Sequence, residues 1–560
     1  MPPEKTSRTP TRPARAKGQG QWALGHREPL NANERTKLDD DGLNVRARIE
    51  NIYAHRGFAS IDPSDLRGRM RWWGLYTQRK PGIDGGKTAV LEPHELDDEF
   101  FMLRIRIDGG QLDLVQLRTI AEVATTYARG TADVTDRQNV QLHWIRIEDV
   151  PAIWEKLEAV GLHTQEACGD TPRVILGSPV AGVADDEIID GTPAIREIER
   201  RFIGDKAFSN LPRKFKTAIS GSPAQDVAHE VNDVSFVGVV HPEHGPGFDL
   251  WVGGGLSTNP MLAQRLGVWV PIDEVADVWA GVVGIFRDYG YRRLRTRARI
   301  KFLVADWGPV RFREVLEQEY LHHALTDGPA PPPPPQTRDH VGVHRQRDGR
   351  FFVGVAPTAG RVSGEKLRQL ADLAEAHGSG RVRTTPHQKL IVLDVPADRV
   401  DSLVQGLDAI GLPARPSQFR RGTMACTGIE FCKLAIVETK AQAAHVVEEL
   451  EHRLPDFATP LTVNINGCPN SCARIQIADI GLKGQLMDDA AGRQVEGYQV
   501  HLGGRLGQGA GFGRKLRGLK VTATDLPDYV ERLAKRFEAQ HEGDERFSDW
   551  VLRAEEADLQ

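Results

Sequence analysis

The sequence is poor in cysteine and has no long apolar run. Only five of its 560 residues are cysteine, too few for the disulfide frameworks that hold small secreted domains together. No apolar stretch is long enough to cross a bilayer, and the N-terminus is basic, proline-rich and polar, without the apolar segment of a signal peptide. We therefore expect a cytoplasmic protein without a membrane partner. Its length allows roughly three or four domains, and its net charge of -5 favours no particular class of partner.

A nucleotide-binding fingerprint is also missing. Gly507, Gly509, Gly511 and Gly513 alternate with other residues but do not give the G-x-G-x-x-G spacing. We therefore expect no NADPH or flavin module in the chain. Any redox chemistry then needs electrons from a partner protein.

Four of the five cysteines form two tight pairs in the C-terminal third. Five residues separate Cys426 from Cys432, and three separate Cys468 from Cys472. Four thiolates on adjoining loops can hold an iron–sulfur cluster. Zinc sites more often have two-residue gaps within each pair, so zinc is the weaker interpretation. Four unrelated buried thiols are the remaining alternative.

The residues around both pairs suit a metal site. The second pair lies in the segment 466–472, Asn-Gly-Cys-Pro-Asn-Ser-Cys, whose residues favour tight turns and inward-pointing amides. In the first pair, Gly428 allows the chain to fold back, and Ile429 and Phe431 can shield a cluster from water.

These two motifs, in this order, resemble the signature of the siroheme-containing sulfite and nitrite reductases. The resemblance implies that Cys426, Cys432, Cys468 and Cys472 bind a 4Fe-4S cluster. It also implies that Cys472 bridges the cluster to the siroheme iron, which would make the two centres one electronic unit.

A second feature is an internal repeat at a shift of 250 residues. Segment 101–162 aligns without gaps on 351–412, and 251–256 aligns on 501–506. The proline-rich run from Gly328 to Pro335 lies between the copies and predicts a stiff, extended connector.

Each copy reads as strand, helix, strand, helix. Residues 101–107 alternate, Leu114, Leu117, Ala121 and Ala124 recur at helical spacing before Gly130, and 140–144 alternate again. Pro151 then opens a second helix that stops at Gly161. Two such units can complete one joint sheet. We expect an internally duplicated α+β fold with pseudo-twofold symmetry and the siroheme and 4Fe-4S cluster at the domain interface.

Only the second copy carries the cysteine pairs, so the repeat predicts a division of labour. We expect an N-terminal extension with a flexible start, a domain formed by two ferredoxin-like repeat halves, a substrate and siroheme domain without cluster ligands, a proline-rich linker, and a 4Fe-4S and siroheme-binding domain. Their predicted ranges are 1–95, 96–163 with 345–415, 164–327, 328–344 and 416–560.

Cations at alternating positions mark a candidate anion site. Lys214 and Lys216 face one side of an extended segment and Phe215 the other, and Arg104 and Arg106 share a face by the same rule. A solvated basic edge strand is the alternative.

The resemblance assigns roles to several polar residues. It implies that Arg104, Arg173, Lys214 and Lys216 surround the substrate face of the siroheme, where they bind a small oxyanion and help to deliver protons. It also implies that Arg137, Gln138 and Asn139 contact the siroheme carboxylates, although a simple turn would explain that segment as well.

A further basic cluster, 292–301, contains Arg293, Arg295, Arg297 and Arg299 at alternating positions. This spacing suits one face of a strand beside a polyanionic cofactor, and a solvated face is an equal alternative. We expect no nucleic-acid partner, because aromatic stacking residues do not interleave with these charges.

The fifth cysteine, Cys168, can be a buried thiol without a role. However, Cys168 and Tyr76 resemble positions at which an actinobacterial branch of the ferredoxin-dependent sulfite reductases carries a Tyr-Cys thioether. That pair favours sulfite as the substrate.

The resemblance therefore implies six-electron reduction of sulfite to sulfide, with an acidic reduced ferredoxin docking on a basic surface. Nitrite reduction to ammonia is the near alternative. A zinc-containing nucleic-acid-binding protein, a cluster-only electron carrier and a corrin-ring monooxygenase on the same scaffold are more distant ones.

Overall fold

The computed structural model describes residues 31–334 and 338–560. The predicted flexible start covers about the first 40 residues. Residues 1–30 lie outside the described residues, as does Pro335 at the end of the proline-rich run, and residues 32–39 form a helix. The described part begins with four short helices, α1 (Ala32–Asp39), α2 (Val45–Arg48), α3 (Ala54–Arg56) and α4 (Pro63–Arg67). Among the described residues, no helix is both long and apolar enough to cross a membrane.

The internal repeat is present in the structure as two copies of one α+β unit, which confirms the predicted duplication. The first copy contains β2 (Asp97–Ile105), β3 (Gln111–Asp113), α5 (Leu114–Tyr127), β4 (Thr131–Val134), β5 (Val140–Ile145) and α6 (Val150–Glu158), with β1 (Leu75–Arg79) at its edge. The second contains β12 (Gly342–Arg345), β13 (Phe351–Val355), β14 (Arg361–Ser363), α10 (Gly364–Ala376), β15 (Arg381–Thr384), β16 (Leu390–Val395) and α11 (Val400–Ala409).

The two copies exchange a strand and form two sheets, so the expectation of one joint sheet was wrong. β14 of the second copy pairs with β4 of the first, and β3 of the first pairs with β15 of the second. The sheet orders are β1-β2-β5-β4-β14 and β12-β13-β16-β15-β3. Each exchanged strand has three residues and leads directly into a helix. The sequence pattern is too short there to reveal the exchange.

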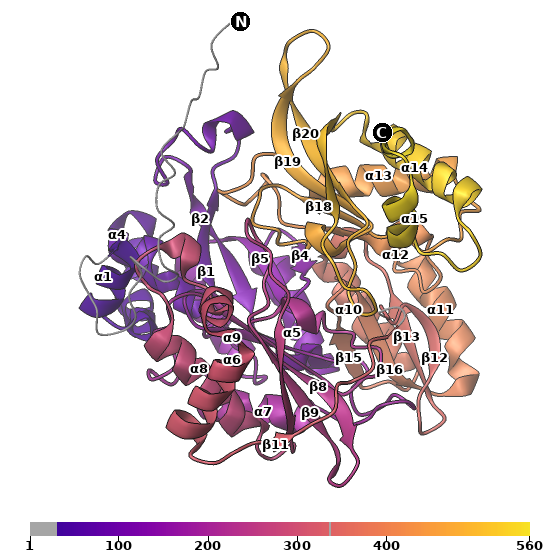
Figure 1. The fold of residues 1–560 in the computed structure, drawn as a ribbon. Coiled ribbons are helices and arrows are strands. Elements are labelled where there is room, and N and C mark those ends of the chain that lie inside the picture. The colour runs from indigo at the N-terminus through magenta and orange to yellow at the C-terminus, as the bar shows by residue number, and fades with distance from the viewer. Residues whose placement is uncertain (1–30, 335–337) are drawn as a thin grey trace, which may run out of the picture.

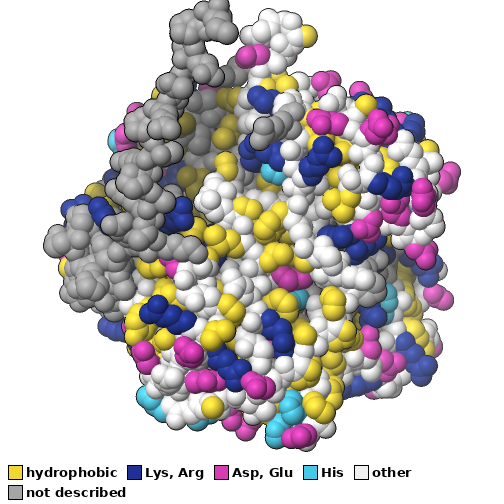
Figure 2. Space-filling view, in the orientation of Figure 1, with side chains coloured by type: hydrophobic (Ala, Val, Ile, Leu, Met, Phe, Trp, Pro, Cys, Tyr) yellow, Lys and Arg dark blue, Asp and Glu magenta, His cyan; other side chains and the backbone are white. Residues whose placement is uncertain are grey.

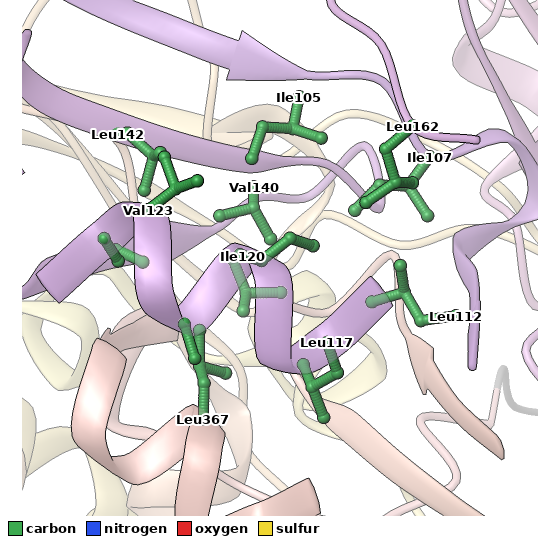
Figure 3. Close-up of a cluster of buried hydrophobic side chains, with 14 of the residues drawn as sticks. Ile105, Ile107, Leu112, Leu117, Ile120, Val123, Val140, Leu142, Leu162 and Leu367 are labelled. Carbon is green, nitrogen blue, oxygen red and sulfur yellow. The ribbon is translucent and has the colours of Figure 1, made fainter. Parts of the chain in front are cut away.

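The helices α5 and α10 pack against each other and join the two copies in one core (Figures 1 and 3). An Asp113–Gln116 capping box begins α5. A Cβ on Gly364, at the start of α10, would lie 2.7 Å from the main-chain oxygen of Ala121. The close approach of the two helices therefore requires a glycine there. The buried Leu117 and Leu367 fill this core from the two copies.

Two further sheets hold the loops that matter for function. The first is six-stranded, ordered β11-β10-β9-β8-β7-β6, and the second is five-stranded, ordered β17-β18-β19-β20-β21. The first comprises β6 (Pro172–Gly177), β7 (Phe215–Ser220), β8 (Val234–His241), β9 (Gly245–Val252), β10 (Gln264–Val270) and β11 (Thr326–Asp327), with helices α7 (Thr192–Phe202), α8 (Val275–Tyr289) and α9 (Ile300–Val315). The second comprises β17 (Thr423–Ala425), β18 (Val463–Asn466), β19 (Ile480–Asp488), β20 (Gln494–Leu502) and β21 (Arg514–Thr522), with α12 (Gln418–Gly422), α13 (Lys440–Arg453), α14 (Leu526–Gln540), α15 (Phe547–Arg553) and α16 (Glu556–Leu559).

These two sheets are also equivalent, but at a shorter offset. Thr217 lies opposite Val234 in the first, and Val463 lies opposite Ile480 in the second, which sets an offset of 246 residues. At that offset Lys216 corresponds to Thr462, and both backbone N–H groups donate to a carboxylate, Asp233 at 2.7 Å and Asp479 at 2.9 Å. The duplication therefore extends through the segments that carry the cysteines.

Candidate active site

The two cysteine pairs meet at one edge of the C-terminal sheet. β17 and β18 are parallel neighbours, with Ala425 opposite Ile465. Cys426 follows the first strand, and Cys468 lies just beyond the second. Because the carboxyl ends of parallel strands share an edge, the two loops lie together. The N–H of Gly467 donates to the Cys426 sulfur over 3.2 Å, which ties the loops at the metal side.

The four thiols influence one another electrostatically. Burial and the nearby Cys472 sulfur raise the pKa of Cys426 to about 12, and the same two causes raise the pKa of Cys432 and Cys468. Among residues 31–334 and 338–560, no three His, Cys, Asp or Glu side chains are placed to share one metal ion. Four thiols gathered at one sheet edge can act as the ligands of an iron–sulfur cluster.

The loop of the first cysteine pair is held rigidly. Gly428 has φ 72°, and a Cβ there would lie 2.4 Å from the Thr439 hydroxyl. That hydroxyl donates to the main-chain oxygen of Cys426 over 2.7 Å. The Phe431 ring is buried and stacks on His143 with centroids 3.8 Å apart, which holds this loop against the first copy. The shielding of a cluster by Phe431 stays a prediction.

The loop of the second pair depends on one asparagine. The Asn466 amide donates to the main-chain oxygen of Cys468 over 2.6 Å and accepts from the N–H of Ala473 over 2.8 Å. The side chain therefore spans the loop that contains both cysteines. Ser471, within that loop, has φ 55°, which matches the expected tight turn.

The four predicted substrate cations come together from three strands or their ends. Arg104 lies in β2, Arg173 in β6, and Lys214 and Lys216 at the start of β7. Arg104 and Arg173 both donate to the main-chain oxygen of Ala167, at 3.3 and 3.4 Å.

The two lysines lie on the side of β7 opposite its core. Phe215 between them is fully buried and packs on Phe286, as alternation predicted. Burial lowers the pKa of Lys214 to about 8; Cys472 opposes this shift, and Arg299 and Arg173 add to it. Burial and the neighbouring Arg137 lower the pKa of Lys216 as well. The site therefore concentrates positive charge within reach of the Cys472 loop.

The three residues of the turn predicted to contact siroheme carboxylates have different surroundings. Arg137 donates to Asn232 over 2.8 Å and to the main-chain oxygen of Val174 over 2.6 Å. Gln138 is fully buried, and its amide bonds to the N–H of Gly177 and the oxygen of Thr384. Asn139 is buried and its side-chain oxygen has no partner among the described residues.

Several buried polar atoms at this site lack hydrogen-bond partners among the described residues. Such atoms indicate whether an anionic cofactor would fit, because a bound group could supply the missing partners. The Nε atoms of Arg104 and Arg137 are buried without a hydrogen bond among the described residues. Burial lowers the pKa of Arg137 to about 9. An unpaired buried donor costs stability, so an anionic group beside these arginines would complete the site. The donor set therefore fits a polycarboxylate cofactor next to four thiolates.

The second basic cluster is not a strand, so that expectation was wrong. Residues Arg295–Arg297 form a single 3-10 turn and α9 begins at Ile300. Arg295 forms an ion pair with Asp170 at 2.6 Å, and Arg299 with Asp233 at 2.7 Å. These arginines hold loops together through carboxylates, and alternation in sequence does not show such pairing.

Cys168 contacts Arg104, and Tyr76 lies on the strand that pairs with the strand of Arg104. Arg104 donates to the buried Cys168 sulfur over 3.0 Å. Tyr76 in β1 lies opposite Met102, two residues before Arg104 on the same face of β2. The thioether itself stays a prediction.

The first copy contains a different set of residues where the second carries its cysteines. Gln138 binds Gly177 and Gln388 binds Ala425, which makes those two positions equivalent. Ser178, Ser222 and Asp226 then correspond to Cys426, Cys468 and Cys472. Asp226 accepts hydrogen bonds from Ser178 and Ser220, both at 2.8 Å, and lies 2.7 Å from His340.

This buried network has no cysteine at the positions equivalent to Cys426, Cys468 and Cys472. Its oxygens are hydrogen-bonded to one another, and His340 from beyond the linker closes it. A cavity of about 1460 Å³ opens beside it, lined by Asp226, His340, Asn464 and Arg474 among others, and none of the cysteines lines that cavity.

Comparison with known proteins agrees with this geometry. The family model "Nitrite and sulphite reductase 4Fe-4S domain" matches residues 168–325 and 417–559, and "Nitrite/Sulfite reductase ferredoxin-like half domain" matches 93–160 and 344–410. The chain belongs to this family of nitrite and sulfite reductases, and is an oxidoreductase.

Similar proteins include both kinds of reductase. A sulfite reductase (ferredoxin) of Mycobacterium tuberculosis H37Rv is 61% identical over 98% of this chain and 100% of its own length. The assimilatory ferredoxin-dependent nitrite reductase of Haloferax mediterranei is 36% identical over 92% of this chain and 91% of its own. The solved structure titled Mycobacterium tuberculosis NirA protein matches with a TM-score of 0.95 and 61% identity, covering 98% of this chain and 100% of that one.

Proposed function

We propose that this protein is a ferredoxin-dependent sulfite reductase that carries out the six-electron reduction of sulfite to sulfide. The observation that carries the proposal is the meeting of four cysteines at one sheet edge with a group of cations from the other copy. The similarity to sulfite reductases is also higher and more complete than that to nitrite reductases.

The cofactors are a 4Fe-4S cluster and siroheme, which together supply electrons and the metal at which substrate binds. Cys426, Cys432, Cys468 and Cys472 would hold the cluster, and Cys472 would also hold the siroheme iron. Arg137 has an unpaired Nε–H that could donate to a siroheme carboxylate. Asn139 would have to use its amide N–H2 group, because its unpaired side-chain oxygen is an acceptor, as a carboxylate is. Gln138, whose amide is already bonded within the protein, would support that turn.

The substrate cations would bind and orient the oxyanion. Arg104 and Arg173, joined through Ala167, are fixed donors for oxygen atoms. Lys214 and Lys216 would add positive charge as electrons arrive and pass protons to departing oxygens. A pKa of about 8 for Lys214 allows it to donate and regain a proton near neutral pH.

Nitrite reduction is the competing function, because nitrite is also a small anion that needs six electrons at the same type of centre. The test is to measure kcat/KM for sulfite and nitrite with the same reduced ferredoxin. A higher value for sulfite supports the proposal, and a higher value for nitrite contradicts it. Family membership gives no support to the zinc, cluster-only and nucleic-acid alternatives. The cytoplasmic location stays a prediction.

The electron donor would dock on a lysine patch beside the cluster loops, defined here as Lys483, Lys515 and Lys520. Lys483 in β19 lies opposite Asn466, which supports the Cys468 loop. Gln499 of β20 lies between Lys483 and Lys520, so the lysines share one face of the sheet. Figure 2 shows Lys and Arg side chains over the region where Figure 1 places β19 and β20.

This patch has a net positive charge. Within the described ranges, no ion pair joins its lysines to a carboxylate. Burial lowers the pKa of His501 to about 4, and the nearby Lys483 and Lys515 add to this shift. Leu434 on the cluster loop is 61% exposed and offers an apolar contact. An acidic ferredoxin complements this surface and would be steered to it.

A further inference from the structure

Arg474 occupies an unusual place in the loop of the second cysteine pair. It lies two residues after Cys472 and has φ 58°, which is uncommon for a residue other than glycine. Its side chain is 7% exposed. The loop therefore directs a charged side chain into the protein immediately after the predicted bridging thiolate.

The guanidinium of Arg474 contacts both copies of the repeat at equivalent positions. One terminal nitrogen donates to the main-chain oxygen of Asp136 over 2.9 Å and to that of Pro386. Asp136 and Pro386 are related by the 250-residue repeat and lie in turns with the same hydrogen bonds, Thr135 to Asn139 and Thr385 to Lys389. A single nitrogen shared by two equivalent carbonyls must lie on or next to the pseudo-twofold axis.

The second copy has an arginine at this position, and the first copy has an alanine. Arg474 and Ala228 each precede a short 3-10 turn in the left-handed region, with φ 58° and 50°. They are equivalent at the offset of this part of the fold. Because both carbonyls already bind one guanidinium on the axis, a second arginine would compete for the same position. A small residue at position 228 leaves the axis to the cysteine-bearing copy.

Arg474 also reaches the substrate side. Its Nε donates to the Asp136 carboxylate over 3.1 Å. Asp136 precedes Arg137, and its carboxylate is also within electrostatic reach of Lys216. The side chain thus connects the Cys472 loop with the cofactor-contacting turn and, through Asp136, with a substrate cation.

We infer that Arg474 is a positioning residue that fixes the Cys472 loop against the 135–139 turn on the pseudo-twofold axis, so that the thiolate and the siroheme-contacting groups keep one relative position. This inference rests on the proposed function. It differs from a general structural role because it predicts an effect on cofactor geometry beyond the effect on folding.

The test compares Arg474→Gln and Arg474→Lys with Arg69→Gln as a matched control. Arg69 is also a buried arginine, but its hydrogen bonds go to Ser64, Asp65 and Thr36 of the N-terminal helices, and it contacts neither the 135–139 turn nor the Cys472 loop. The measurements are the ratio of siroheme to cluster in purified protein, the magnetic coupling of the two centres by Mössbauer spectroscopy, and the thermal unfolding temperature.

In Arg474→Gln we expect the siroheme-to-cluster ratio to fall at least threefold, or the magnetic coupling of the two centres to weaken. The values for Arg474→Lys should lie between those of Arg474→Gln and wild type. Arg69→Gln should lower the unfolding temperature without changing either cofactor measurement. If Arg474→Gln does not fold, Asp136→Asn keeps the backbone acceptors and should weaken the coupling in the same direction.

A wild-type ratio and coupling in the Arg474 and Asp136 variants would overturn the inference. That result leaves the proposed function intact, because wild-type protein would still carry both cofactors and form sulfide. Wild-type protein that binds no siroheme, or forms no sulfide, would instead contradict the proposed function.

Discussion

Neutralising the lysine patch tests where electrons enter the protein. The change is Lys483→Gln, Lys515→Gln and Lys520→Gln in one variant. Two unit charges 4 Å apart in water attract by about 1 kcal/mol, and exposed ion pairs measured in proteins contribute about 0.2–1 kcal/mol each. Three such contacts should weaken ferredoxin docking by about 1.4 kcal/mol, which corresponds to roughly a tenfold loss in kcat/KM at low salt.

The assay measures sulfide formation at varied ferredoxin concentration in low salt and near 0.5 M salt. At the higher salt the Debye length falls to roughly 4 Å, so the wild type and the variant should converge. Methyl viologen, a small cationic donor, should support both proteins equally, which separates docking from catalysis. Lys156→Gln with Lys535→Gln removes two positive charges elsewhere, from lysines that pair with Glu122 and Glu531, and is the control for a general loss of positive charge. An unchanged kcat/KM for ferredoxin in the triple variant would refute the docking surface.

Three further predictions concern other parts of the structure. Burial raises the pKa of Glu166 to about 8 from its ordinary 4.5, so the protonated form favours folding and stability is lost as pH rises through that interval. Glu166→Gln should remove about 5 kcal/mol of this pH dependence in urea unfolding, and an unchanged dependence would contradict it. Peptide mapping of active enzyme should find Tyr76 and Cys168 in one cross-linked peptide, whereas two separate peptides would exclude the thioether. Asp226→Ala should destabilise the protein by about 2–4 kcal/mol through loss of its buried bonds to serine and histidine; a loss below about 1 kcal/mol in the same unfolding assay would mean that the network contributes little.

The part of the site that sequence predicts well is carried by local motifs. The cysteine spacing and the turn residues around Asn466 lie within a few positions of one another, so their chemistry is visible without the fold. The sequence predicts that Lys214 and Lys216 lie on one side of a strand, because residues two apart in an extended segment point to the same face. Phe215, packed on Phe286, confirms that direction.

Contacts between the copies were not visible in the sequence. The exchanged strands β3 and β14 have three residues each, too few to show alternation. The offset between copies falls from 250 residues to 248 at the Cys426 loop and to 246 at the Cys468 loop, so Asp226 does not align with Cys472 in an ungapped comparison. Arg474 could have drawn attention as a charged residue directly after the motif, but its partners Asp136 and Pro386 are known only from the fold.

The wrong prediction of a strand at 292–301 has a different cause. Alternating arginines indicate a strand face only if the segment is extended, and here it forms a 3-10 turn and then a helix. Asp170 and Asp233 supply the compensating charges from distant positions. Charge pairing across such separations depends on tertiary structure, which the local pattern does not contain.

The most direct test of the whole account is the electron stoichiometry of the purified enzyme. Protein produced with ample iron and siroheme would be supplied with sulfite and reduced ferredoxin, and sulfide and oxidised ferredoxin would be counted together. The account predicts one sulfide for every six ferredoxin molecules oxidised, and no sulfide from the Cys472→Ser variant. A wild-type enzyme that oxidises ferredoxin without forming sulfide, or a Cys472→Ser variant with full turnover, would contradict it.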